Sequence, residues 1–68
     1  MSNQLIKYKT PTNEDAKSLP TVEVRPDESY NWQEAVLLAV VENPPRYIVM
    51  TQNGDITRWN LCRMEEDK

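Results

Sequence analysis

The sequence predicts a small all-β domain, and three observations indicate it. Residues 21–25 (TVEVR) alternate between apolar and polar side chains, which is typical of a half-buried strand. Residues 46–52 and 55–61 are rich in strand-forming side chains. They flank Asn53-Gly54, the dipeptide that most favours a tight β-hairpin. Short antiparallel strands joined by tight turns are therefore expected.

The length and composition allow one small domain. The chain has 68 residues and 8.0 kDa, with 38% apolar residues and a mean hydropathy of -0.77. Its longest apolar run, 35–41, is far below the roughly 20 residues of a membrane span. We expect a strand candidate and flexible tether over 1–19, a single domain over 20–64, and an acidic tail over 65–68. Residues 10–20 are polar and are expected to bury little area.

Several classes of chemistry lack the residues they need. The chain has one cysteine, no histidine and one glycine, so it cannot build a four-ligand zinc site, a histidine-based triad or a glycine-rich phosphate loop. We therefore expect no enzyme, no metal and no cofactor. The net charge of -3 does not favour nucleic-acid binding. No charged and then apolar leader opens the sequence, so a cytoplasmic protein is expected.

A two-residue hairpin loop would fix the pairing of the last two long strands. It places Ile48 opposite Trp59 and Met50 opposite Thr57. That side is the more apolar one and is expected to face the core, together with Leu61. The other side, which includes Tyr47 and Arg58, is then expected to face solvent.

Residues 31–43 allow two interpretations. As a helix, Asn31 would cap the segment and Glu34 would stand at the third helical position. As a strand, alternate residues from Ala35 to Val41 would face the core. The run is apolar on every face, so periodicity does not decide between them. An α+β fold, with a helix at 32–42 packed on a small antiparallel sheet, is therefore the alternative to the all-β fold.

A resemblance to a known family favours the strand. The elements that carry it follow one another over residues 20–64: an alternating strand at 21–25, the acidic pair Asp27-Glu28, Trp32-Gln33-Glu34-Ala35-Val36-Leu37, the turn Asn43-Pro44-Pro45, Tyr47-Ile48-Val49, Asn53-Gly54-Asp55, Trp59, and Leu61-Cys62-Arg63. This order resembles the SH3-like barrels of the Tudor kind. The resemblance implies a small barrel of four to five antiparallel strands. The last strand is short here, so either residues 4–9 or self-association is expected to cover the edge that it leaves.

The same resemblance implies a binding role. Trp32 matches an aromatic of the cage in which Tudor domains hold methylated lysine or arginine by cation–π attraction. Gln52 and Asn53 stand where further cage aromatics would be, so this sequence departs from the family pattern there.

The function expected first is a non-catalytic protein-binding module with an aromatic and basic surface patch. Its predicted binding residues are Tyr30, Trp32, Tyr47, Arg46 and Arg58. The alternative reading of Trp32 is a core residue, as expected for Trp59, and Cys62 is expected to be a buried, unreactive thiol. The expected partner is another protein or peptide, with no membrane, and self-association into a homo-oligomer stays open.

Two other functions remain as alternatives. One is a small regulator or inhibitor of the phage type that occludes a larger host protein. The other is a weak nucleic-acid-binding accessory protein, whose basic residues would be Lys7, Lys9, Arg46, Arg58 and Arg63.

Overall fold

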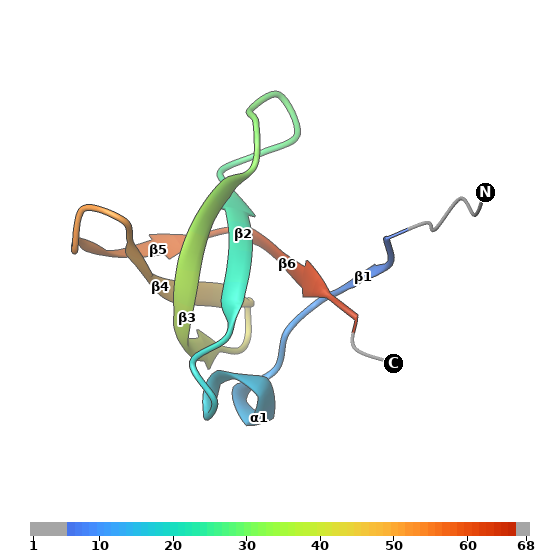
Figure 1. The fold of residues 1–68 in the computed structure, drawn as a ribbon, viewed down its shortest axis with the longest axis vertical. Coiled ribbons are helices and arrows are strands. Elements are labelled where there is room, and N and C mark those ends of the chain that lie inside the picture. Colours follow the sequence, from blue (N-terminus) through green and yellow to red (C-terminus); the bar gives the residue numbers. More distant parts are fainter. Residues whose placement is uncertain (1–5, 67–68) are drawn as a thin grey trace.

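The computed structural model of the chain describes residues 6–66 and shows an antiparallel sheet with one short helix (Figure 1). In chain order the elements are β1 (Tyr8–Lys9), α1 (Asn13–Ala16), β2 (Thr21–Arg25), β3 (Gln33–Val41), β4 (Arg46–Thr51), β5 (Ile56–Trp59) and β6 (Leu61–Glu65). The six strands lie in the order β1-β6-β2-β3-β4-β5. The predicted all-β class is confirmed.

The segment that allowed two interpretations is a strand. β3 pairs with β2 on one side and with β4 on the other, so the α+β alternative with a helix at 32–42 is wrong. A register shift between Leu37 and Ala39 marks a bulge at Leu38. Before the bulge Ala35 and Leu37 are buried, and after it the buried residue is Val40. An apolar run on both faces therefore suits this strand, because the bulge changes which residues face the core.

The hairpin joining β4 and β5 exists, but its register differs by one residue from the predicted one. Tyr47 pairs with Trp59 and Val49 with Thr57. The amide of Gly54 donates to the carbonyl oxygen of Thr51 at 2.9 Å, and the amide of Thr51 donates to the carbonyl oxygen of Asp55 at 2.8 Å. The loop thus has three residues, 52–54. Within residues 51–55 only Gly54 has a positive φ, of 90°, as in a three-residue loop that ends in a bulge.

This shift exchanges the two faces of β4, whereas β5 keeps Trp59 on the core side. Tyr47 and Val49 are buried, whereas Ile48 is half-buried and Met50 is 38% exposed. The predicted core face of Ile48 and Met50 is therefore wrong, because one added loop residue moves the side chains of β4 to the other face, while Trp59 on β5 keeps its side.

The core lies on one face of the curled sheet. Its buried residues are Ala16, Val22, Val24, Ala35, Leu37, Val40, Tyr47, Val49 and Cys62, with Trp59 and Met64 packed against them. Four of these side chains are almost fully enclosed, namely Leu37, Val22, Val24 and Val49. β2, β3 and β4 thus supply the centre of the core.

The sheet is strongly curved. β5 and β6 are four places apart in the strand order, which would separate them by about 19 Å in a flat sheet. Only Asn60 lies between them in the chain, and one such residue spans at most about 7 Å from Trp59 to Leu61. In Figure 1 the chain accordingly runs from β5 directly into β6, and in this view it crosses β2 and β3.

The segment before β2 belongs to the folded domain. β1 pairs with β6 and so fills the edge that residues 4–9 were expected to fill. Residues 4 and 5 lie outside the described residues. Pro11 and Ala16 are buried. Residues 8–9 thus form a strand as expected, and residues 10–19, expected to form a loose tether, contain α1. Glu65, expected in an acidic tail, ends β6 opposite Tyr8, and 67–68 lie outside the described residues.

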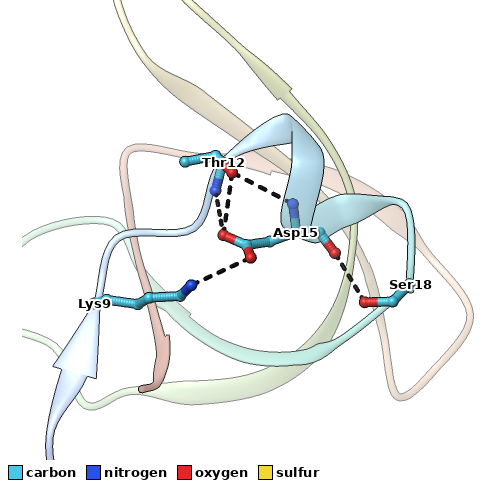
Figure 2. A network of polar contacts seen from close by, with 4 residues as sticks. All are labelled: Lys9, Thr12, Asp15 and Ser18. Carbon is cyan, nitrogen blue, oxygen red and sulfur yellow. Dashed lines mark hydrogen bonds and ion pairs between the residues drawn. The ribbon is translucent and has the colours of Figure 1, made fainter. Parts of the chain in front are cut away.

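A capping box explains why α1 forms in a polar segment (Figure 2). The amide of Asp15 donates to the hydroxyl of Thr12 at 3.3 Å, and the amide of Thr12 donates to the carboxylate of Asp15 at 2.9 Å. Lys9 adds an ion pair to the same carboxylate at 3.2 Å. The hydroxyl of Ser18 donates to the carbonyl oxygen of Asp15. The two capping-box bonds satisfy amides that a helix start leaves without partners, and the Ser18 bond satisfies a carbonyl oxygen near the helix end.

Candidate functional site

The face of the sheet opposite the core, here called the outer face, presents an ordered set of polar and aromatic side chains. Strand pairing places Tyr8 opposite Glu65, Glu23 opposite Arg63 and also opposite Glu34, and Val36 opposite both Thr21 and Met50. Because side chains alternate along strands, these residues share one face. Their neighbours Val22, Val24 and Ala35 point into the core.

Two arginines and two aromatic residues stack on this face, and we call Tyr8, Arg63, Trp32 and Arg25 the arginine–aromatic ladder. The guanidinium carbon of Arg63 lies 3.8 Å from the ring centroid of Tyr8 and 4.3 Å from that of Trp32. The guanidinium carbon of Arg25 lies 4.2 Å from the Trp32 centroid. These distances are within the range of cation–π attraction. Trp32, half-buried, thus contacts both guanidinium groups, rather than lying in the core.

Polar contacts hold the two arginines in place. Arg63 Nε donates to Glu23 Oε1 at 2.7 Å, between two strands whose pairing sets these residues directly opposite each other. Arg25 Nη1 donates to the carbonyl oxygen of Tyr30 at 3.2 Å, which ties the loop after β2 to the ladder. Arg25 Nε is buried and has no hydrogen-bond partner among residues 6–66. Charged hydrogen bonds of this kind fix the guanidinium planes.

A hollow of ≈ 260 Å³ opens where β6 leaves β2. The pairing of β2 with β6 stops at Glu23 and Arg63, and β6 then pairs with β1. The lining residues are Tyr8, Thr21, Val22, Glu23, Glu34, Arg63, Met64 and Glu65. The divergence of the strands therefore produces the hollow, and the ladder borders it at Tyr8 and Arg63.

A second hollow of ≈ 200 Å³ adjoins the first over β3. Its lining residues are Thr21, Glu34, Ala35, Val36, Met50, Thr51 and Gln52. Thr21 and Glu34 line both hollows, so the two lie side by side across the strands, and we call them together the outer-face groove. Its first half is charged and its second half has an apolar floor.

The groove has a surplus of negative charge. Arg63, the basic residue that lines it, is engaged by Glu23. Glu34 is exposed and accepts one hydrogen bond, from the side-chain amide of Gln52 at 3.3 Å. Glu65 is also exposed. Two carboxylates at this groove therefore have no ion-pair partner among residues 6–66.

The predicted binding residues do not form one patch. Tyr30 is 56% exposed beside Arg25, and Trp32 is part of the ladder. Arg58 is exposed on β5 opposite Ile48. Arg46 is half-buried at the start of β4, where its Nη1 donates to the carbonyl oxygen of Pro45 at 2.8 Å. The structure thus brings only Tyr30 and Trp32 together.

Tyr47 is not an exposed residue. It is 6% exposed in the core, and burial, followed by the effect of nearby Cys62, raises the pKa of its hydroxyl. The expected surface pair of Tyr47 and Arg58 is therefore wrong, because the shifted register sends these side chains to opposite faces. Trp59 packs against the core as expected, and its indole N–H donates to the hydroxyl of Thr57 at 2.6 Å.

Cys62 has the predicted environment. It is a buried free cysteine, and burial raises the pKa of its thiol to about 12. The thiol is therefore protonated at neutral pH, and thiolate is the nucleophilic form.

The predicted protein-binding patch missed Tyr8, Arg25, Glu34 and Arg63, of which Arg63 was named only for the nucleic-acid alternative. One of them had a local signal, since a hairpin with a loop over 26–31 places Arg25 opposite Trp32. The pairings of β6 with β2 and with β1 join distant parts of the chain, and no local sequence pattern predicts them.

Comparison with models of protein families, with curated proteins and with solved structures gave no match to this chain. Within residues 6–66, no helix has the length and apolar character needed to cross a membrane. The same part of the chain contains no group of three His, Cys, Asp or Glu side chains placed to hold a metal ion.

Proposed function

We propose that this protein is a non-catalytic protein-binding module whose binding surface is the outer face of the sheet. The arginine–aromatic ladder is the observation that supports this proposal. Tyr, Trp and Arg are the residue types most enriched at binding hot spots. The ladder lies on the face opposite the core, so its stacked rings and guanidinium groups are additional to the apolar packing that stabilises the sheet.

The ladder suits binding because its side chains are already ordered. Arg63 is fixed by Glu23 and by two rings, and Arg25 is fixed by a loop carbonyl and by Trp32. Ordering a long side chain on binding costs about 0.5–1.5 kcal/mol, and a preordered surface avoids much of that cost. The predicted patch is accordingly redrawn: Tyr30 and Trp32 remain, and Tyr8, Arg25 and Arg63 replace Tyr47, Arg46 and Arg58.

For the fold we propose a small SH3-like barrel. The support is the strand order β6-β2-β3-β4-β5, a meander whose last strand returns to pair with its first. The joint of one residue between β5 and β6 adds to it, because it requires the sheet to curl toward closure.

A selection from a random peptide library, followed by two-dimensional NMR, tests the binding role. Selected peptides are expected to shift the amide signals of residues on β2, β3 and β6. Trp32→Ala is expected to weaken their binding at least about tenfold, as hot-spot truncations do. Lys17→Ala, at the exposed end of α1, is the matched control and should leave binding unchanged.

Melting curves of each variant separate lost binding from lost folding. Arg63→Ala provides a second disruption of the ladder if Trp32→Ala lowers the melting temperature. Enrichment of no peptide, or amide shifts confined to the β4–β5 edge, would contradict the proposed surface.

A further inference from the structure

We propose that the outer-face groove binds an extended partner segment in which a basic side chain and an apolar side chain stand two positions apart. The basic side chain occupies the hollow between β2 and β6, and the apolar side chain covers Val36 and Met50. This inference rests on the proposed binding function and adds the chemistry of the partner.

The first hollow suits an ammonium or guanidinium group. Glu34 and Glu65 line it with carboxylates that have no ion-pair partner among residues 6–66, and Arg63 is already engaged by Glu23. A cation entering there meets two negative charges and the ring of Tyr8. An anion would meet the same carboxylates, so charge complementarity selects a basic partner.

Backbone groups at the same hollow offer further hydrogen bonds. The amide of Leu37 donates to the carbonyl oxygen of Pro20, so the next residue, Thr21, directs its N–H and C=O groups toward β6. The amide of Glu66 donates to the carbonyl oxygen of Lys7, so Glu65 directs its backbone groups toward β2. No strand pairing joins Thr21 to Glu65 within the described residues. Their carbonyl oxygens are therefore acceptors for the donors of a basic side chain.

The second hollow suits an apolar side chain. Val36 and Met50 contribute apolar surface to it, and Met50 is 38% exposed. Ile56, 66% exposed, pairs with Met50 on the same face and extends this surface toward the β5 edge. Covering exposed apolar side chains of this kind favours association.

The distance between the hollows sets the spacing of the two groups. One hollow lies between β6 and β2 and the other lies over β3, which is about 7–10 Å apart at the usual strand separation. Alternate side chains of an extended segment point the same way and stand about 7 Å apart. A basic residue two positions from an apolar residue therefore matches the groove.

Synthetic glycine- and serine-rich peptides of about ten residues test this pattern by NMR titration at millimolar concentration. The test peptide holds Arg two positions before Leu. One control peptide has Arg and Leu adjacent, so that they point to opposite sides, and a second has Glu in place of Arg. The test peptide is expected to shift the amides of Thr21, Glu34, Val36 and Glu65. Each control is expected to bind several-fold more weakly.

Protein variants check the same contacts. Glu34→Gln combined with Glu65→Gln is expected to weaken binding of the test peptide about tenfold and to reduce its salt dependence. Glu42→Gln, an exposed position in the turn after β3, is the matched control. All these positions are exposed, so folding should be retained.

The outcomes separate this inference from the proposed function. Equal affinity for the three peptides, or no effect of the double variant, overturns the inference. Library peptides that bind the ladder but contain no basic residue would overturn it too, while leaving the binding module standing. Failure of every peptide to bind the outer face overturns both.

Discussion

Replacing Asn13 by alanine should destabilise the protein strongly, although Asn13 lies in a segment that looks like a linker. Its side-chain amide donates to the carbonyl oxygen of Val40 at 2.6 Å and accepts from the amide of Val40 at 2.9 Å. The amide of Leu37 donates to the carbonyl oxygen of Pro20, just before β2, and this is the last backbone hydrogen bond on that edge of β3. The side chain of Asn13 therefore supplies the next two hydrogen bonds along this edge of β3, beyond the point where β2 begins.

The magnitude follows from the two bonds. Each is worth about 1 kcal/mol net, and leaving Val40 groups without partners adds a desolvation cost. Val40 is 9% exposed, so water reaches it only in part. We expect the free energy of unfolding to fall by about 2–3 kcal/mol. In a domain of this size that corresponds to a melting temperature lower by roughly 10–20 °C.

Thermal and urea unfolding followed by circular dichroism measure this loss, and hydrogen exchange of the Val40 amide locates it. Glu14→Ala is the matched control, because Glu14 is on the same helix and makes only an exposed ion pair with Lys17 at 3.4 Å. If Asn13→Ala melts within a few degrees of Glu14→Ala and leaves Val40 protected, α1 is not fixed to β3 and the reasoning fails.

Three further predictions concern a carboxylate, the thiol and the hairpin. Hydrogen bonds from the backbone of Thr12 and then from the side chain of Lys9 lower the pKa of Asp15 below its usual 3.8. The ionised carboxylate of Asp15 thus favours the folded state at neutral pH, and this contribution to stability is lost as the pH falls through the pKa of the folded state. An NMR titration of Asp15 should show a midpoint below 3.8. Asp15→Asn should remove this part of the loss of stability in acid. Burial raises the pKa of the Cys62 thiol to about 12. A thiol reagent at pH near 8 should therefore label the folded protein at least about a hundredfold more slowly than the urea-unfolded protein. Equal labelling rates would show that the thiol is accessible in the folded protein. Val49→Ala should lower the free energy of unfolding in urea by about 2 kcal/mol, whereas Met50→Lys should change it by about 0.5 kcal/mol or less. A larger loss for Met50→Lys than for Val49→Ala would instead support the register with a two-residue loop.

The hairpin shows how far local sequence goes. Asn53-Gly54 correctly located the turn, because the loop requires a residue that adopts a positive φ and Gly54 supplies it. It did not fix the loop length, since the same glycine serves either as the second residue of a two-residue loop or as the last residue of a three-residue loop. One residue of difference decides which face is buried, so the core face and the exposed Tyr47 were both predicted wrongly.

The helix and the ladder had signals of different strength. Thr12 and Asp15 have the spacing of a capping box, so α1 was within reach of the sequence. The stacking of Arg63 between Tyr8 and Trp32 requires β6 to lie between β1 and β2, which depends on contacts between distant segments. The burial of Cys62 was predicted from its apolar strand, because a thiol without nearby charged groups behaves as a small apolar side chain.

The position of β6 inside the sheet affects how the protein can assemble during synthesis. Among the strands of residues 6–66, β6 is the last to be made, yet it separates β1 from β2. While the ribosome still holds residues 61–65, β1 has no neighbour to pair with and one long side of β2 is bare. Arg63 can therefore reach the rings of Tyr8 and Trp32 only after β6 has been made, whereas Arg25 and Trp32 are present earlier. A chain cut before Leu61 would lose a strand from the middle of the sheet rather than from its margin.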